Sequence, residues 1–357
     1  MKRIVMTGGG TSGHVTPNIA LFDALKERGY DIQYIGSQSG IEKNIIENTG
    51  IPFHSISSGK LRRYLDLKNI ADAFRVLKGF SDALRTVRKL KPNVVFSKGG
   101  YVSTPVVWAA FLCRVPVVVH ESDYTPGLAN KLSLPFASKI CYTFPETERY
   151  LPKSKSVLTG VPVRSVLHTG SRAKGLELCG FDNSKPVIMI IGGSLGSKRI
   201  NSVVRDALDV LLANFQICHI CGKGGIEETL NSKKGYKQFE YVDKELPHFF
   251  SMADIVISRA GATAIFEILS LKKPNILIPL SDKVSRGDQI LNAKSFEKQG
   301  YSCVLPDDEL TSDILLKSIN ETYKNKDRFI KEMQNSNYGN SINKVIAVID
   351  STAIAAR

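Results

Sequence analysis

The stretch Ile4-Val5-Met6-Thr7-Gly8-Gly9-Gly10-Thr11-Ser12-Gly13-His14 decides the fold that we expect for this chain. The apolar run before the glycines is typical of a buried strand, and Asn18 to Leu25 carries apolar residues at helical spacing. Glycines between the two elements permit positive φ angles and let a ligand approach the backbone closely. The amide groups that begin such a helix suit phosphate oxygens or a developing oxyanion, so we predict an anion-binding strand, turn and helix. A tight turn without a ligand is the alternative.

Two well-known glycine loops do not account for this stretch. A Walker A loop requires Gly-Lys-Ser/Thr, and no lysine stands between Gly8 and His14. The dinucleotide pattern Gly-x-Gly-x-x-Gly is present, but the second strand, Ile32 to Ser37, ends without the carboxylate that binds the ribose. We therefore expect no dinucleotide and no other cofactor. His14 follows the loop directly, where a titratable side chain could project into the same crevice as the amides.

Length and composition favour a soluble enzyme of two domains. The 357 residues exceed the usual size of one hydrophobic core, and 43% hydrophobic with 23% charged residues is ordinary for a globular protein. No apolar run approaches the roughly 20 residues of a membrane helix, and the amino terminus does not resemble a secretory signal, so we expect a cytoplasmic location. Six scattered cysteines indicate reduced thiols. Cys218 and Cys221 lie three apart in a predicted strand and point to opposite faces, which disfavours a zinc site.

The net charge of +14 predicts an acidic partner. Nucleic acid, anionic lipid headgroups and a pyrophosphate substrate all fit, and charge alone does not choose among them. The segment from Leu61 to Lys91 interleaves basic with apolar residues. It has two explanations: a pair of crossover helices with solvated basic faces, or a surface that rests on an anionic membrane.

Strand and helix patterns alternate along the chain, which predicts parallel sheets covered by helices. In the first half the strand-like runs are Ile4 to Met6, Ile32 to Ile35, Val94 to Ser97, Val115 to Val119 and Lys139 to Thr143. The plan restarts at Val187 to Lys198, with a strand, a double glycine, a hydroxyl residue, a glycine and a helix. We therefore expect similar α/β domains at 1–160 and 164–342, whose sheet ends face a common cleft. Residues 343–357 could return to the first domain as a helix.

A further candidate site follows the predicted strand Ile255 to Ile257. The small residues Gly261 and Ala262 allow a pyrophosphate to approach the start of the next helix, and Glu267 is placed to accept hydrogen bonds from ribose hydroxyls. A solvated helix residue is the alternative for Glu267.

Two amide side chains and one arginine complete the residues that we single out. Gln289 and Asn292 could discriminate sugar hydroxyls or an acetamido group through directional hydrogen bonds. The chain contains no Asp-x-Asp sequence, so we expect no metal pair of the kind that many sugar transferases use. Charge on a departing nucleotide would then fall to helix N-termini and to basic side chains such as Arg164.

Four segments make a recognisable combination: Gly9-Gly10-Thr11-Ser12-Gly13-His14-Val15, Gly99-Gly100-Tyr101-Val102-Ser103, Gly192-Gly193-Ser194-Leu195-Gly196-Ser197, and the region from Gly261 to Asn292. In this order and spacing, they resemble the MurG family of peptidoglycan N-acetylglucosaminyltransferases over nearly the whole chain. The resemblance implies an α/β GT-B fold, with two Rossmann-like parallel-sheet domains facing a central cleft. It also implies an inverting transfer of N-acetylglucosamine from UDP-N-acetylglucosamine to undecaprenyl-pyrophosphoryl-N-acetylmuramyl-pentapeptide at the cytoplasmic face of the membrane.

Under this resemblance the N-terminal domain would take the acceptor and face an anionic membrane surface, and the C-terminal domain would take the UDP-sugar. Its motifs and the reasoning above together predict donor contacts at Thr11, Ser12, Gly13, Arg164, Ser194, Gly261, Ala262, Glu267, Gln289 and Asn292. Acceptor contacts are predicted at His14, Gly99, Gly100 and Tyr101. We expect no nucleic-acid partner.

The reaction that we expect is a single in-line displacement, in which the muramyl 4-hydroxyl attacks the anomeric carbon and UDP departs. His14 is the first candidate for the base, because imidazole titrates near neutral pH, and Glu121 is the second. Bracing the loop or binding the acceptor pyrophosphate are alternative roles for His14. A UDP-N-acetylglucosamine 2-epimerase, another lipid glycosyltransferase and a basic binding module remain alternative functions.

Overall fold

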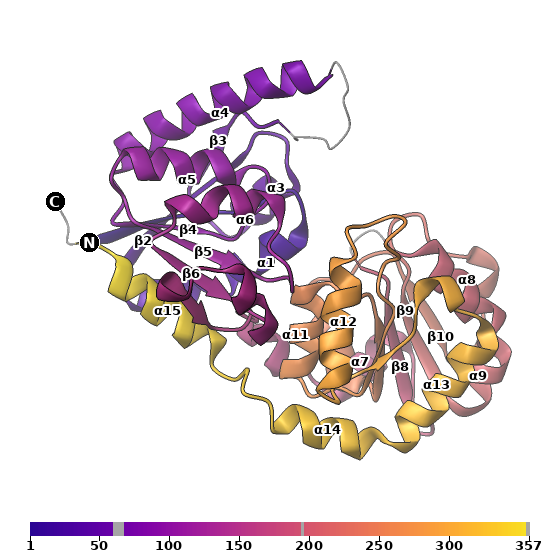
Figure 1. Cartoon of the computed structure of the whole chain (residues 1–357). Helices are drawn as coiled ribbons and strands as arrows, with labels where there is room; N and C mark the ends of the chain where they lie inside the picture. Colours follow the sequence, from indigo (N-terminus) through magenta and orange to yellow (C-terminus); the bar gives the residue numbers. More distant parts are fainter. Residues whose placement is uncertain (60–67, 194–195, 355–357) are drawn as a thin grey trace. The chain divides into compact units, whose positions relative to one another are not determined.

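The computed structural model describes residues 1–59, 68–193 and 196–354, without the side chains of 68–74. It divides into two compact units (Figure 1). Unit 1 comprises Met1–Arg164 and Asn340–Arg357, and unit 2 comprises Ser165–Gly339. The short link after Thr159 has no regular secondary structure up to Arg164.

Unit 1 is built on a seven-stranded parallel sheet in the order β3-β2-β1-β4-β5-β6-β7. Its strands are β1 (Lys2–Thr7), β2 (Tyr30–Ser37), β3 (Phe53–Ile56), β4 (Val94–Ser97), β5 (Val117–Glu121), β6 (Lys139–Tyr142) and β7 (Ser156–Leu158). Its helices are α1 (Thr16–Ile19), α2 (Phe22–Glu27), α3 (Ile41–Glu47), α4 (Lys68–Leu90), α5 (Ser103–Leu112), α6 (Leu128–Ser133) and α15 (Ser341–Thr352).

Alternating side chains of these strands fill two hydrophobic layers, because successive residues of a strand point to opposite faces. Ile4 and Met6 of β1 pack with α2 and α15, whereas Val5 packs with α4 and α5. Figure 1 shows α4 and α5 on one side of this sheet and α15 on the other. The last helix of the chain thus completes the core of unit 1.

Unit 2 repeats the plan with six parallel strands in the order β10-β9-β8-β11-β12-β13. The strands are β8 (Val187–Ile191), β9 (Gln216–Ile220), β10 (Tyr236–Phe239), β11 (Ile255–Ser258), β12 (Asn275–Leu277) and β13 (Cys303–Val304). The helices are α7 (Arg172–Cys179), α8 (Lys198–Asp206), α9 (Leu208–Asn214), α10 (Leu246–Met252), α11 (Ala262–Ser270), α12 (Asp288–Lys298), α13 (Ser312–Lys324) and α14 (Lys326–Gln334). Residues of α8, α9 and α13 share one core layer with the sheet, and α11 and α12 lie on its other side (Figure 1).

The expected fold class of two Rossmann-like parallel-sheet domains is confirmed by these two sheets. In each unit the strand order reverses between the first and fourth strands, which are β1 and β4 in unit 1 and β8 and β11 in unit 2. Open α/β sheets bind ligands beyond the carboxyl ends of the strands at this switch point. The glycine loops singled out in the sequence follow these four strands.

The structure departs from the expected elements in several places, and the strands β10 and β13 of unit 2 are among those that were not expected. The strands β3 and β7 were not expected, because these short strands of four and three residues include half-buried and exposed positions in place of a continuous apolar run. The expected pair of helices within Leu61 to Lys91 is wrong for the described part, since Lys68–Leu90 is one helix. Gly79 lies within this helix, at a position where a side chain would overlap the Ser57 carbonyl oxygen of the neighbouring segment. Residues 61–67 lie outside the described residues.

The helix expected from Asn18 to Leu25 is divided into α1 and α2, with a 3₁₀ turn, Ser12–His14, ahead of them. All six cysteines are free thiols, and Cys218 lies within β9. None of the described helices combines the length and hydropathy needed to cross a membrane.

Candidate active site

The first glycine loop, Gly8 to Gly13, is held in place by buried polar side chains of unit 1. The Tyr34 hydroxyl donates a 2.7 Å hydrogen bond to the Gly8 carbonyl, and the Asn18 amide lies 3.0 Å from the Tyr34 oxygen. Asn18 also donates to the carbonyl of His14 at 3.4 Å. Both side chains are fully buried, so they fix the backbone on either side of the loop.

The outer part of this loop carries the predicted donor and acceptor contacts. Thr11 is exposed, and Ser12, Gly13 and His14 are half-buried, in a 3₁₀ turn closed by a 3.1 Å hydrogen bond from the His14 amide to the Thr11 carbonyl. The structure therefore brings these four residues together at the carboxyl end of β1. Thr11 is therefore open to solvent, and Ser12 and His14 are partly so.

The second glycine loop, Gly99 to Tyr101, packs directly on the first. Gly100 has a φ of 87°, and a side chain at this position would overlap the Gly9 carbonyl oxygen. A side chain at Gly10 would lie 2.8 Å from a ring carbon of Tyr101. Only glycine allows this contact, so the predicted acceptor residues Gly99, Gly100 and Tyr101 lie beside the loop that carries His14.

Glu121, the second candidate base, is engaged in holding the turn that follows β5. One carboxylate oxygen accepts the Asp123 amide at 2.9 Å, and the other accepts the Gly127 amide at 3.0 Å and the Asn130 side-chain amide at 2.8 Å. Its exposed fraction is 4%. Since a general base must present a lone pair to the substrate, this arrangement suits loop bracing better than proton abstraction.

Lys98 is a buried lysine between β4 and the second glycine loop. It was not among the residues predicted from the sequence. Its side chain is 1% exposed, and its ammonium group donates to the Ser122 hydroxyl. Burial lowers the pKa of Lys98 to about 8, although the charges of Glu121 and Asp123 act in the opposite direction. Burial and the charge of Lys98 together hold the pKa of the neighbouring His120 well below its usual value.

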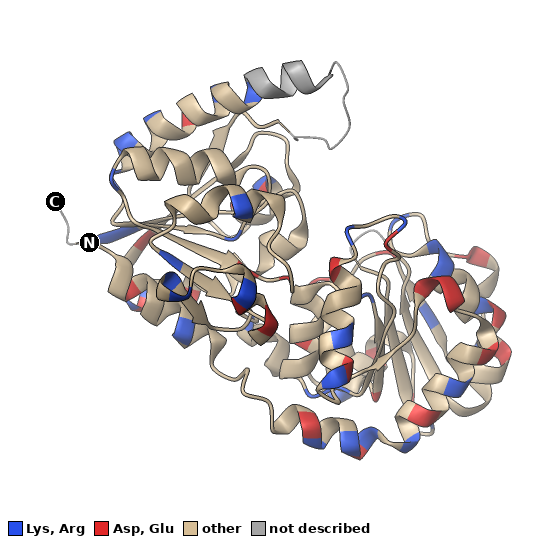
Figure 2. Ribbon diagram, viewed as in Figure 1, with Lys and Arg blue, Asp and Glu red and all other residues tan. Residues whose placement is uncertain are grey.

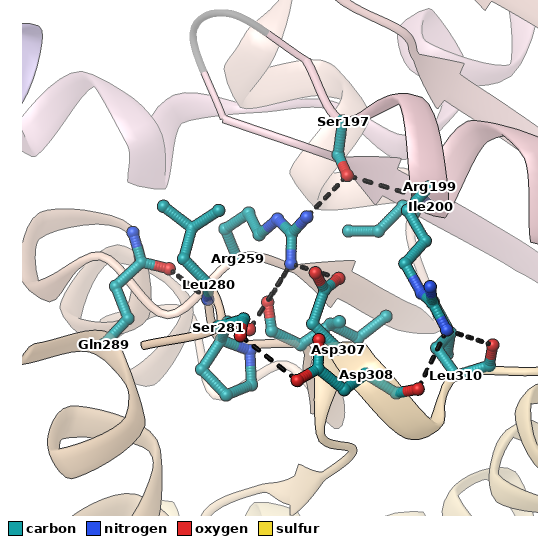
Figure 3. Close-up of polar contacts among 12 residues, drawn as sticks. Ser197, Arg199, Ile200, Arg259, Leu280, Ser281, Gln289, Asp307, Asp308 and Leu310 are labelled. Carbon is teal, nitrogen blue, oxygen red and sulfur yellow. Dashed lines mark hydrogen bonds and ion pairs between the residues drawn. The ribbon is translucent and has the colours of Figure 1, made fainter. Parts of the chain in front are cut away.

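In unit 2, Arg259 stands directly after β11 and joins the loops that follow β8, β12 and β13 (Figure 3). Its guanidinium donates to the Ser197 hydroxyl at 2.6 Å, to the Asp307 carboxylate at 2.7 Å and to the Ile278 carbonyl at 3.1 Å. Ser197 also caps helix α8 by accepting the amide of Ile200. Arg259 is 8% exposed, so its charged hydrogen bonds serve to hold these loops together inside the protein.

Gln289 and Asn292, predicted to contact the sugar, both bind the backbone of Ala260. The carbonyl oxygen of Gln289 accepts the amides of Ala260 at 3.3 Å and Leu280 at 3.1 Å, the latter drawn in Figure 3. The side-chain amide of Asn292 donates to the Ala260 carbonyl at 3.2 Å. Asn292 is fully buried, whereas Gln289 is half-buried and can still direct its NH₂ group toward a ligand.

Three of the remaining predicted donor residues, Gly261, Ala262 and Glu267, lie at or in helix α11. Gly261 precedes this helix without a side-chain cap, with open space where a Cβ atom would stand, and Ala262 is its first residue. Glu267 lies in the middle of the helix and is 7% exposed. Ser194 lies outside the described residues. Arg164, half-buried, is the last residue of the first segment of unit 1.

Some residues that hold these loops could not have been identified from a pattern in the sequence. Asn18 lies on a helix and Tyr34 within a strand, and only the fold brings them to the Gly8 loop. Lys98 and Arg259 could have been identified, because each is a charged residue that directly follows a buried strand. In the described residues no group of three His, Cys, Asp or Glu side chains is arranged to hold a metal ion.

Comparisons with known proteins give a consistent answer. Residues 4–142 match the glycosyltransferase family 28 N-terminal domain, and residues 187–349 match the glycosyltransferase family 28 C-terminal domain. The UDP-N-acetylglucosamine–N-acetylmuramyl-(pentapeptide) pyrophosphoryl-undecaprenol N-acetylglucosamine transferase of Clostridium tetani is 58% identical over 349 residues, which cover 98% of either chain.

Solved structures agree with this match. The crystal structure of Acinetobacter baumannii MurG has a TM-score of 0.76 at 25% identity, covering 98% of this chain and 100% of that one. A structure of the UDP-GlcNAc 2-epimerase from Neisseria meningitidis reaches a TM-score of 0.67 at 13% identity, covering 98% of this chain and 100% of that one. The latter likeness shows a shared fold only.

Proposed function

The chain belongs to glycosyltransferase family 28, and on this basis we propose that it transfers N-acetylglucosamine from UDP-N-acetylglucosamine to lipid-linked N-acetylmuramyl-pentapeptide. The acceptor is undecaprenyl-pyrophosphoryl-N-acetylmuramyl-pentapeptide, and the product is the lipid-linked disaccharide precursor of peptidoglycan. The observation that carries this proposal is the near-full-length match to the Clostridium tetani transferase. The glycine loops at both switch points support it, because two phosphate-bearing substrates need two such sites.

Unit 2 binds the donor in this proposal. The amide groups at the starts of α8 and α11 face the pyrophosphate, for which the uncapped start of α11 is suited. Glu267 accepts hydrogen bonds from the ribose, and the NH₂ group of Gln289 contacts the sugar. Asn292, being fully buried, acts on the donor through the Ala260 backbone that it holds. Ser194 and Arg164 retain their proposed donor contacts.

Unit 1 binds the acceptor and supplies the base. Tyr101, Gly99 and Gly100 line the acceptor pyrophosphate, and Thr11 to Gly13 meet the incoming sugar. The His14 imidazole takes the proton of the muramyl 4-hydroxyl as its oxygen bonds to the anomeric carbon. The bond from that carbon to the UDP oxygen breaks in the same step, so UDP leaves with the electron pair and the α-linked donor gives a β-linked product. Glu121 positions the turn after β5 by its three accepted hydrogen bonds.

The acceptor lies in a membrane, and the surface formed by helices α4 and α5 of unit 1 carries side chains suited to an anionic bilayer. Leu77 on α4 and Phe111 and Leu112 at the end of α5 are exposed by 65%, 51% and 59%, and the two helices pack together. Basic residues accompany them, and Figure 2 shows several Lys and Arg positions along α4. Exposed apolar side chains among positive charges favour peripheral binding to anionic lipid. We place this face on the cytoplasmic leaflet.

The experiment that tests the proposed reaction measures UDP release with and without acceptor. The full-length protein is incubated with UDP-N-acetylglucosamine alone and then with a short-chain lipid-linked muramyl-pentapeptide. We expect UDP release only when both substrates are present. Conversion of the UDP-sugar without acceptor would instead support an epimerase.

A further inference from the structure

A buried carboxylate lies beneath the first glycine loop, and no step of the proposed reaction uses it. Glu42 stands in the first turn of α3, and its exposed fraction is 0%. One oxygen accepts the Ser37 amide at 2.9 Å and also the Ser37 hydroxyl. The other oxygen accepts the amide of Gly10 at 3.1 Å. These three donors compensate a charge that no ion pair neutralises within the described part of the chain.

Glycines from three segments leave the space that this carboxylate occupies. A side chain at Gly9 would lie 2.5 Å from the Glu42 carboxyl carbon, and one at Gly40 would overlap the carboxylate oxygens. A side chain at Gly36 would approach Cγ of Glu42 to 3.0 Å. The carboxylate is therefore enclosed by the glycine loop itself, by strand β2 and by the turn before α3.

This contact changes the role of the loop's amides. An N–H group that already donates to a carboxylate cannot donate equally well to a phosphate oxygen, and a second anion there would be repelled. The Gly10 amide thus serves the internal carboxylate. The Tyr101 ring lies so close to Gly10 that an added side chain would come within 2.8 Å of it, so the Gly10 backbone also borders the second loop.

We propose that Glu42 is a positioning residue for sugar transfer: its carboxylate holds Gly10 and thereby fixes the outer loop from Thr11 to His14 against Tyr101. The proposal rests on the proposed function of this loop in acceptor binding and proton transfer. Its corollary is that the Gly10 amide stays bound to Glu42 when the acceptor binds.

The test compares Glu42→Gln with Glu47→Gln, which removes an exposed carboxylate from the same helix. Glutamine keeps the shape of Glu42 but carries no charge, so none of the remaining hydrogen bonds is charge-assisted. Its NH₂ group must also face either the Gly10 or the Ser37 amide, so at least one backbone amide loses its acceptor. The fraction of protein with a folded unit 1 is measured by the fluorescence of Trp108, the single tryptophan, which lies in the same unit as Glu42. We expect kcat per folded protein to fall roughly 10- to 100-fold in Glu42→Gln and to stay within about twofold in Glu47→Gln.

A residue that only stabilised the fold would lower the folded fraction of unit 1 and leave kcat per folded protein unchanged, and this result would overturn the proposal. A measurement on the unmodified protein decides the matter even if Glu42→Gln does not fold. We expect the exchange protection of the Gly10 amide hydrogen to be present without substrate and unchanged by the short-chain lipid-linked acceptor. Protection that arises only with the acceptor would contradict the proposal. Absence of transfer by the unmodified protein would instead refute the proposed function.

Discussion

Replacing Lys98 with methionine should make the protein more stable, by an amount that decreases as the pH rises. The ammonium group is buried at 1% exposure, and burial lowers its pKa from 10.5 to about 8. Between these two values the unfolded chain binds a proton that the folded protein does not hold. The stability of the unmodified protein therefore rises with pH in this window, and the full penalty of the buried charge is present below pH 8.

The size of the effect follows from the pKa difference. At about 1.4 kcal/mol per pKa unit, the charged lysine destabilises the folded state by about 3 kcal/mol at pH 7. Methionine removes this penalty, but it leaves the Ser122 hydroxyl without the donor that it has now, which costs about 1–3 kcal/mol at any pH. The net increase in stability at pH 7 is therefore the difference between these two opposing energies. This increase should fall by about 1 kcal/mol between pH 7 and pH 9, because only the penalty of the buried charge depends on pH.

Denaturant unfolding of both proteins at pH 7, 8 and 9 measures this difference, with tryptophan fluorescence reporting on unit 1, where the single Trp108 lies. Replacement of the exposed Lys26 by methionine is the control for loss of one positive charge and should change stability by no more than about 0.5 kcal/mol. A stability difference between Lys98→Met and the unmodified protein that did not vary with pH would show that burial does not lower the pKa of Lys98.

Three further predictions concern the loops and the membrane face. Arg259→Met should destabilise unit 2 by about 3–5 kcal/mol, because Asp307 loses its buried partner, and should raise KM for the UDP-sugar; an unchanged urea midpoint would argue against this brace. His14→Ala should lower kcat roughly 100-fold or more with UDP affinity retained, whereas Glu121→Gln should act mainly on stability; the reverse pattern in kinetics and thermal melting would exchange their roles. Leu77→Glu should weaken sedimentation with phosphatidylglycerol vesicles, whereas the control Val210→Glu in unit 2 should not; equal binding of all three proteins would refute the membrane face.

The strand, turn and helix at the start of the chain could be predicted because its determinants are local. The apolar run of β1, the glycines and the residues after them lie within one short stretch, and the same pattern recurs after β8. The parallel sheets followed from the alternation of such units. The exact division of the first helix into α1 and α2 did not follow, since the sequence from Asn18 to Leu25 has an uninterrupted helical pattern.

The bracing of the loops could not be predicted because it depends on contacts between distant residues. Glu42 reaches Gly10 from another helix, and its burial requires glycine at positions that the sequence alone does not bring together. Gln289 and Asn292 carried the right chemistry for a sugar, but the amide of Asn292 is directed to the Ala260 backbone. A polar side chain near a ligand site can bind the ligand or hold the loop, and only the fold distinguishes the two.

The measurement that tests the central claim most directly is the identification of the product formed from UDP-N-acetylglucosamine and a short-chain lipid-linked muramyl-pentapeptide. Mass spectrometry and NMR of the isolated lipid should show one added N-acetylglucosamine, β-linked to the muramyl 4-oxygen, with one UDP released for each. An α-linkage would contradict the single displacement. No transfer at concentrations that saturate the binding of both substrates would contradict the assignment of the reaction itself.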